Sequence, residues 1–301
     1  MAPEVPGPAA KAPELPEPAA AKVKLSPEKA ARKSRESLWM LRKAIPRSYR
    51  LPFAVAMPII LTLAWCALTL GKNPVIKPLY IASPPEVIRA TLAMIFEHTL
   101  FADIWASTVR IVIAFVAAAV VALPLGIAMG AFEPVNRLLE PLMAPLRYLP
   151  ISAFIPLFIL WFSIGEMQKI SFLFLGVFVY LLPVVVTAIR AVPEELVQTA
   201  LTLGATRWQV IRTVLVPAAL PDIFDSFRVM NAIAWTYVVL AEMVNAHEGI
   251  GHMIQEQGNL FHTPQVFSGI IAVGIIGLIT DGIIRTLNNV LFRWRETGEV
   301  S

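Results

Sequence analysis

Long apolar segments with few charges limit what this chain can fold into more than any other feature. Segments such as 105–131 and 170–189 reach the roughly 18 apolar residues that a membrane-spanning helix needs. The chain is 57% hydrophobic and 15% charged, whereas soluble domains are nearer half apolar and a quarter charged. We therefore expect an all-α integral membrane protein. A soluble helical protein with buried helices is the alternative that these long, charge-poor segments disfavour.

The breaks between the apolar segments predict six transmembrane helices. Pro124, Pro156 and Pro183 lie within predicted helices, where proline kinks the axis. The third segment is short for a hydrocarbon layer of roughly 30 Å, so we expect it to be broken or shallow. The expected spans are 51–70, 105–131, 151–164, 170–189, 223–244 and 266–292.

Basic residues set the expected orientation, because loops rich in Lys and Arg stay in the cytoplasm. Residues 1–50 hold eleven Lys or Arg and five Glu. Beside membrane helices this basic segment indicates orientation rather than nucleic-acid binding. The loop 245–264 contains no Lys or Arg and is placed outside, and both termini are placed inside. The inner loops carry Arg137, Arg147, Arg190, Arg207 and Arg212, and the C-terminal tail carries Arg293 and Arg295.

The region before the first span is expected to lie outside the six-helix transmembrane domain of residues 51–295. Residues 1–33 are rich in Pro, Ala, Lys and Glu, a composition that favours a disordered cytoplasmic tail. Residues 34–50 place Leu38 and Leu41 on one helical face, which is typical of an amphipathic helix on the membrane surface. An unstructured basic linker is the alternative for 34–50. Residues 296–301 form a second short tail.

The outer connection after the first span is expected to contain a short helix. Ser83 precedes two prolines and Glu86, a pattern that favours a helix start. The expected apolar face consists of Val87, Ile88, Leu92 and Ile95.

A polar, basic segment interrupts the apolar runs at 194–221 and must therefore lie in water. Pro193 and the two glutamates after it favour a helix start. Gly204 ends that helix, since glycine adopts positive φ readily, and Thr206 caps a second helix over 207–216. This helix–turn–helix either binds a partner or only covers the membrane surface. Its apolar ridge consists of Leu196, Ala200, Leu203 and Trp208, and Pro217 and Pro221 bound its end.

The same segment resembles the EAA motif of binding-protein-dependent ABC permeases. The motif begins Glu-Ala-Ala, continues to a glycine and ends in apolar residues followed by proline. Gln198 replaces its Glu, Thr199 its first Ala and Val216 its Leu. The stretches 222–244 and 248–257 look like the nitrate, sulfonate and taurine branch of the family. The matching positions are Gln198, Thr199, Ala200, Gly204, Val214, Val216 and Pro217, and the similarity covers about residues 81–295.

The resemblance implies a type I ABC importer permease in the bacterial inner membrane. Its partners are ATPase subunits, an extracytoplasmic solute-binding protein and a second copy of the chain in the lipid bilayer. No G-x-x-x-x-G-K-[ST] phosphate loop occurs in the sequence, so ATP and Mg²⁺ are expected on the ATPase. The subunit itself is expected to be no enzyme and to hold no cofactor or metal. The expected cytoplasmic coupling loop spans residues 191–221. Its expected ATPase-coupling residues are Glu195, Leu196, Gln198, Thr199, Ala200, Leu203, Gly204, Ala205, Trp208 and Pro217.

Ionisable side chains inside the predicted spans indicate either function or structural pairing. Arg110 and Glu242 fall near the outer ends of their spans, where they are able to pair. Arg228 and Asp281 form a second expected pair nearer the inner side. An arginine in such a pair either meets an anionic solute or only stabilises the fold. The translocation-path candidates are Arg110, Arg228, Asn231, Thr236, Glu242 and Asp281.

Small residues and histidines complete the pattern. A stripe of small residues in the second span permits close helix packing within the subunit or between copies. Trp235 is expected to pack rather than to stack on a solute. The histidines fall on the predicted outer side without the close spacing of a metal site. The stripe is Ala118, Ala122, Gly126 and Gly130, and the histidines are His98, His247, His252 and His262.

The sequence thus predicts a permease for a small anion such as nitrate, a sulfonate or taurine. Bicarbonate, cyanate and a thiamine-precursor pyrimidine stay open as solutes of the same class of permease. A standalone secondary carrier is the alternative from another class, although the inverted repeats and midplane acids of carriers are missing from the pattern. A membrane enzyme needs a catalytic set of His, Asp or Ser that the predicted spans do not offer.

Overall fold

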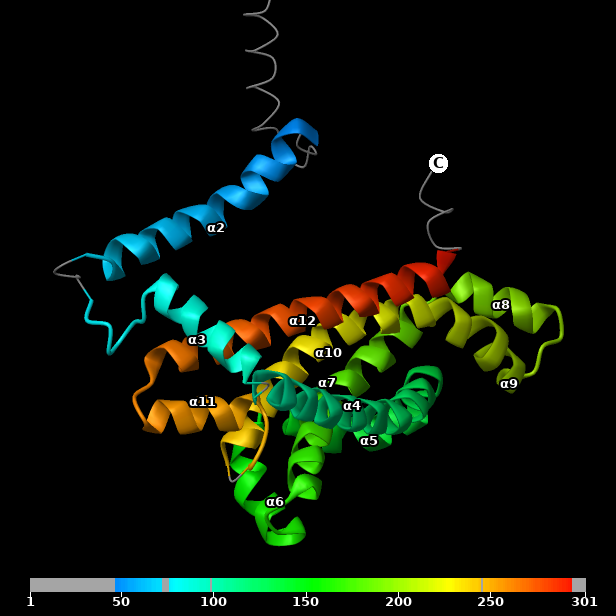
Figure 1. Ribbon diagram of the computed structural model, residues 1–301. Coiled ribbons are helices and arrows are strands. Elements are labelled where there is room, and N and C mark those ends of the chain that lie inside the picture. The colour runs from blue at the N-terminus through cyan, green and yellow to red at the C-terminus, as the bar shows by residue number, and fades with distance from the viewer. Residues whose placement is uncertain (1–46, 72–75, 98, 245, 294–301) are drawn as a thin grey trace, which may run out of the picture. The chain divides into compact units, whose positions relative to one another are not determined.

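The computed structural model describes residues 47–71, 76–97, 99–244 and 246–293, and every regular element within them is a helix (Figure 1). The chain divides into two units, Met1–Leu63 and Ala64–Ser301, with the boundary inside α2 (Arg47–Thr69). The predicted tail of 1–33, most of the predicted helix 34–50 and the tail of 296–301 lie outside the described residues.

The first helix that lies wholly within the second unit is α3 (Pro84–Phe96). It confirms the expected short helix after the first predicted span. Glu86 accepts hydrogen bonds from the backbone N (2.9 Å) and the Oγ (2.7 Å) of Ser83. These bonds fix the helix start and lower the pKa of Glu86. Of the expected apolar face, Val87 is buried, whereas Ile88 and Leu92 are exposed, and α3 packs against the C-terminal helix.

Two long helices, α4 (Thr99–Ala131) and α7 (Glu166–Arg190), pack along each other in the second unit. The small residues of α4 face α7. Ala122 is fully buried, and a Cβ added to Gly126 would lie 2.7 Å from the Val185 side chain. The stripe of small residues therefore packs within the subunit, which is one of the two locations expected for it.

The segment between these helices is a bent helix pair. α5 (Glu133–Leu146) occupies the predicted cytoplasmic loop, and a 3₁₀ turn (Ile151–Phe154) leads into α6 (Ile155–Phe162) at 89° to α5. With eight residues, α6 rises only about 12 Å, less than half of a hydrocarbon layer of roughly 30 Å. The predicted span 151–164 therefore contains one helix that is too short to cross the layer alone, which fits the expectation of a broken or shallow span.

The C-terminal half of the second unit consists of α10 (Val216–Met243), α11 (Ile250–Asn259) and α12 (Thr263–Leu291). α10 and α12 lie side by side, and α11 connects the C-terminal end of α10 to the N-terminal end of α12 (Figure 1). α10 also packs against α7, where Ile223 and Val238 are fully buried. This arrangement places α10 between the core of the unit and α12.

Length and composition select four of the described helices as able to cross a membrane, and a fifth if the bent pair counts as one span. α10 is long enough at 28 residues, but Arg228, Asn231 and Glu242 make it more polar than the others. The all-α membrane fold is confirmed, while the total of six spans stays a prediction. The four helical stretches are Leu51–Thr69, Thr99–Ala131, Glu166–Arg190 and Thr263–Leu291.

Candidate functional site

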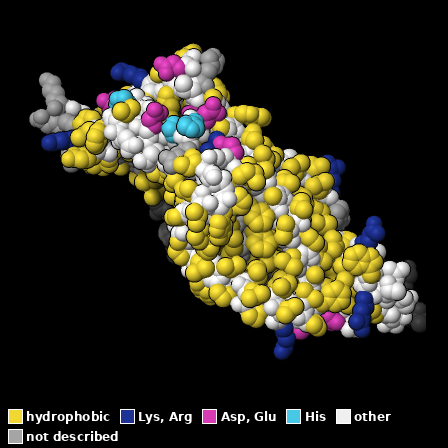
Figure 2. Space-filling view, turned by 90° about the horizontal axis from the view of Figure 1, so that it is seen from below, with side chains coloured by type: hydrophobic (Ala, Val, Ile, Leu, Met, Phe, Trp, Pro, Cys, Tyr) yellow, Lys and Arg dark blue, Asp and Glu magenta, His cyan; other side chains and the backbone are white. Residues whose placement is uncertain are grey.

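Charged side chains lie at the two ends of a broad apolar surface. Figure 2 shows a band of hydrophobic side chains between two ends that carry charged side chains of both signs, with the His residues at one of these ends. Val120 and Leu278 are among the large apolar side chains exposed on the long helices. Such a surface suits lipid contact, because hydrocarbon satisfies no polar group.

A helical hairpin forms at the polar segment that the sequence singles out. α8 (Glu194–Thr202) ends at Gly204, whose φ of +86° is a left-handed conformation that glycine adopts readily. Thr206 is the N-cap residue of the following helix, α9 (Arg207–Val210). The Gln209 side chain accepts a hydrogen bond of 2.8 Å from the Thr206 backbone N, as in a capping box. The predicted helix–turn–helix is therefore confirmed.

The hairpin exposes an apolar ridge to solvent. Leu203 is 83% exposed and Trp208 69% exposed, with Leu196 beside them also exposed. Gln198, at the motif position normally held by Glu, donates to Glu194 within α8 at 2.7 Å. Large apolar side chains on an otherwise polar helix mark a surface that a partner covers.

The second helix of the hairpin does not end at Val216, as the prolines predicted, but continues into α10. Residues Ile211–Leu215 form a π-helical turn, and α10 follows at once. The wider turn accommodates Pro217 at the start of α10, and Pro221 lies inside that helix without ending it. The exposed hairpin is therefore connected to α10 by unbroken helix.

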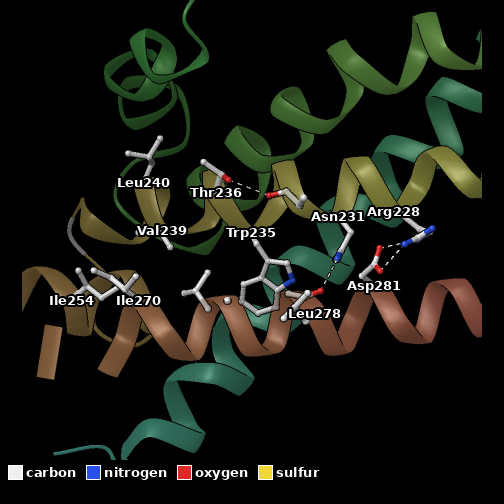
Figure 3. A pocket seen from close by; sticks show the side chains of 14 residues that line it. Arg228, Asn231, Trp235, Thr236, Val239, Leu240, Ile254, Ile270, Leu278 and Asp281 are labelled. Carbon is white, nitrogen blue, oxygen red and sulfur yellow. Dashed lines mark hydrogen bonds and ion pairs between the residues drawn. The ribbon is translucent and has the colours of Figure 1, made fainter. Parts of the chain in front are cut away.

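A groove of about 650 Å³ lies between α10 and α12, closed at one end by α11 (Figure 3). Its volume falls in the range of small-molecule sites. Most of its wall is apolar, with Val239, Ile254 and Leu278 as examples. Four of the six predicted path candidates line it: Arg228, Asn231, Thr236 and Asp281.

The expected pair of Arg228 and Asp281 is confirmed in this groove. Arg228 Nε and Nη2 donate to the two carboxylate oxygens of Asp281 at 2.8 Å each. The side chains keep 34% and 32% of their surface exposed. The ion pair is thus bidentate, and both of its side chains line the groove.

The other polar side chains of the groove donate hydrogen bonds to Thr280 of α12 or to their own helix. Asn231 Nδ2 donates to Thr280 Oγ1 at 2.9 Å, and the Trp235 indole donates to the same oxygen at 3.2 Å. Trp235 is buried, so it packs as expected. Thr236 Oγ1 donates to the Ala232 carbonyl of its own helix. Arg228 and Asp281 are therefore the groove's charged features.

Arg110 and Glu242 also pair as expected, but in a buried network at the end of the unit that is predicted to face outward. Arg110 Nη1 donates to Glu242 at 2.7 Å and to the Glu248 carbonyl at 2.8 Å. Its Nε and Nη2 donate to Glu166 at 2.6 and 2.8 Å, and Lys169 also donates to Glu166. Neither Arg110 nor Glu242 lines the groove. Glu166 was missed because only the tertiary structure brings it to α4.

The Glu242 carboxylate also fixes the start of α11. It accepts hydrogen bonds from Ser107 Oγ at 2.8 Å and from the Gly251 backbone N at 2.9 Å. A Cβ added to Gly249, whose φ is +123°, would collide with the carboxylate. Glu242 is fully buried. Ser107, Lys169, the Glu248 carbonyl and the Gly251 backbone N complete the hydrogen bonds of Arg110, Glu166 and Glu242. The network is therefore a structural connection between α4, α7, α10 and α11.

A second cavity, of about 670 Å³, lies beside this network. His247, His252 and His262 line it together with acidic residues such as Asp103 and Glu256. His98 lies outside the described residues. Within the described ranges, no group of three or more His, Cys, Asp or Glu side chains is arranged to hold a metal ion.

The family profile described as "Binding-protein-dependent transport system inner membrane component" matches residues 122–291. The chain belongs to this family. It is therefore a multi-pass inner-membrane permease subunit of an ABC importer, which works with a separate ATPase subunit and a solute-binding protein. The alternatives of a standalone carrier and a membrane enzyme are thereby set aside.

Curated relatives cover most of the permease. The taurine transport system permease protein TauC of Escherichia coli is 32% identical over 249 residues, which cover 81% of this chain and 89% of TauC. The formylaminopyrimidine transport permease protein ThiX of Halalkalibacterium halodurans is 24% identical over 83% of this chain and 98% of ThiX. The two names refer to chemically different solutes.

A solved structure supports the same fold. The inward-facing MetNI methionine ABC transporter matches the permease with a TM-score of 0.55 at 19% identity, covering 67% of this chain and 97% of the other. At this identity the likeness concerns the fold alone, which is that of a type I ABC importer permease.

Proposed function

We propose that this permease imports a small organic sulfonate, with taurine as the test case, along the groove between α10 and α12. The observation that carries the proposal is Arg228, the one basic side chain among the described residues that line the groove. A guanidinium binds the oxygens of an oxyanion with paired N–H donors. The name of TauC supports a sulfonate as the anion.

A thiamine-precursor pyrimidine is the second candidate solute. The groove wall is mostly apolar, which suits a heterocycle, and ThiX is named for formylaminopyrimidine transport. The two candidates differ in the group that Arg228 would meet, and therefore in their dependence on it. A pyrimidine offers only neutral hydrogen-bond acceptors, whereas zwitterionic taurine offers an anionic sulfonate group that loses its charged partner when Arg228 is replaced.

The proposal assigns the hairpin of α8 and α9 to the ATPase. Leu203 and Trp208 are exposed, and truncation of exposed aromatic and leucine anchors weakens partner binding by about 1–2 kcal/mol or more. Because the hairpin continues into α10, a movement of the ATPase is transmitted to the helix that carries Arg228. The docking set is Glu195, Leu196, Gln198, Thr199, Ala200, Leu203, Gly204, Ala205, Trp208 and Pro217.

The proposal also includes a homodimer with both termini in the cytoplasm. A two-fold pair of identical subunits is the simplest closed assembly for a permease that builds one wall of a path. Arg137, Arg190 and Arg207 are exposed on the side of the hairpin, and basic loops stay in the cytoplasm.

The solute is tested by uptake into proteoliposomes that contain the permease, its ATPase and its binding protein. Radiolabelled taurine is offered to the wild type and to Arg228→Gln. We expect ATP-dependent uptake by the wild type and a loss of about tenfold or more in the variant. Uptake of a formylaminopyrimidine without uptake of taurine supports the second candidate and overturns the first.

A further inference from the structure

The guanidinium of Arg228 keeps one edge open while it is paired. Arginine has five N–H donors in a planar fork. Nε and Nη2 occupy one edge with the carboxylate of Asp281. Nη1 makes no hydrogen bond with any residue in the described ranges, so the edge formed by Nη1 and Nη2 is open. That edge matches two oxygens of a sulfonate, carboxylate or nitrate.

The groove gives this open edge a nearly neutral setting. Arg228 and Asp281 are the charged members of its lining. Asp225 and Arg285 lie about one turn away on α10 and α12, outside the lining, and carry opposite charges. The positive charge that an entering anion meets is therefore largely compensated by the Asp281 carboxylate at 2.8 Å.

Compensation of this kind is what a transport path needs. An unpaired arginine in an apolar groove attracts an anion strongly, because the local dielectric is low. A path must bind its solute well enough to admit it and weakly enough to release it. A neighbouring carboxylate lowers the affinity of the guanidinium without removing the donors that recognise the anion.

We propose that Asp281 sets the strength with which Arg228 holds an anionic solute, so that the pair forms a weak anion-binding site in the groove. The proposal rests on the proposed function of the groove as a path for small anions. Arg228 recognises the anion through its open edge. Asp281 touches the arginine rather than the anion, and its charge keeps release fast.

The test measures binding and transport separately. The permease–ATPase complex is purified without the binding protein, and equilibrium binding of radiolabelled taurine is compared for the wild type and Asp281→Asn. We expect the variant to bind taurine about tenfold more tightly, because the compensating charge is gone. In proteoliposomes the same variant is expected to show a maximal uptake rate reduced about fivefold or more, because release slows.

Two further variants control the experiment. The double variant R228Q/D281N removes both charges and is expected to bind taurine no more tightly than the wild type. Glu133→Gln is the matched control, because Glu133 accepts hydrogen bonds from two arginines, Arg137 and Arg190, away from the groove. It is expected to leave both binding and uptake unchanged.

The outcomes separate this proposal from the function on which it rests. Uptake by the wild type, together with wild-type binding and uptake in Asp281→Asn, overturns the role of Asp281 and leaves the path intact. A wild type that transports no taurine overturns the proposed solute and this inference with it. If Asp281→Asn does not assemble, Arg228→Lys replaces it. An ammonium has no second edge, so taurine binding is expected to fall about fivefold, and unchanged binding overturns the proposal.

Discussion

Two arginines meet carboxylates inside the helical bundle of this permease, and their surroundings differ. Arg110 exposes 7% of its side chain and bonds to Glu166, Glu242 and a backbone carbonyl. Arg228 exposes 34% of its side chain and bonds to Asp281. Both sites pair an arginine with a carboxylate, but Arg110 is enclosed in a complete network with two glutamates, whereas the pair of Arg228 and Asp281 borders a groove.

The difference teaches that burial and completeness, rather than charge alone, separate a structural pair from a functional one. Removal of one partner from a buried network leaves an uncompensated charge and costs about 3–5 kcal/mol. A partly exposed pair contributes about 0–1 kcal/mol. Stability therefore accounts for Arg110, whereas it gives little reason for Arg228 and Asp281 to be in the groove.

The largest expected effect follows from Arg110→Met. The substitution leaves Glu242 fully buried without its cation and is expected to lower the free energy of unfolding by about 3–5 kcal/mol. Thermal unfolding in detergent, followed by size-exclusion chromatography, measures the loss. Arg137→Met is the control, because its side chain is 79% exposed and also pairs with a glutamate. A melting curve like that of the wild type would show that the outer network does not stabilise the fold.

The next largest effect is expected at the hairpin of α8 and α9, where a substitution weakens ATPase binding without changing either arginine pair. Gly204→Val places a β-branched residue at a φ of +86°, which distorts the turn between α8 and α9 and is expected to weaken ATPase association about tenfold or more. Co-purification with the ATPase measures it, while membrane insertion is retained. Gly71→Val is the matched control, since Gly71 also has a positive φ and open space around it. Intact co-purification by Gly204→Val contradicts the coupling role of the hairpin.

The smallest effect is expected at Glu86, whose carboxylate accepts hydrogen bonds from neutral groups of Ser83 rather than from an arginine. The backbone N–H of Ser83, followed by its hydroxyl, lowers the pKa of Glu86 below 4.5. A lowered carboxylate pKa stabilises the fold above the unfolded-state pKa, and this contribution is lost as pH falls through the folded-state pKa. We expect Glu86→Gln to lower the melting temperature by about 2 °C or less at pH 7. A difference from the wild type that does not shrink as the pH falls through the acidic range contradicts this assignment.

The sequence predicted both arginine–carboxylate pairs because the span boundaries placed their members at similar depths. It did not predict Glu166 as a partner of Arg110. Glu166 is the first residue of α7, and only the packing of α7 on α4 brings its carboxylate to the guanidinium. The hydrogen bond from Gly251 to Glu242 was missed for the same reason, since a backbone donor carries no signal in side-chain type.

The hairpin was predicted well up to its second helix, because caps and glycine turns are local signals. The continuation into α10 was missed because Pro217 and Pro221 end most helices in water. Here a π-helical turn precedes them and keeps the helix unbroken. The groove was also beyond sequence reasoning, since it depends on how α10 and α12 are rotated against each other. That rotation places Arg228, Asn231 and Thr236 of α10 and Asp281 of α12 along the same groove.

The most direct test of the contrast between the two sites is uptake by R228Q/D281N, which removes the groove pair without leaving a lone charge. The pair is partly exposed, so the variant is expected to melt within about 3 °C of the wild type and to retain its ATPase. ATP-dependent taurine uptake is expected to fall below about a tenth of the wild-type rate. A folded variant that transports taurine at the wild-type rate would contradict the assignment of this groove to the transport path.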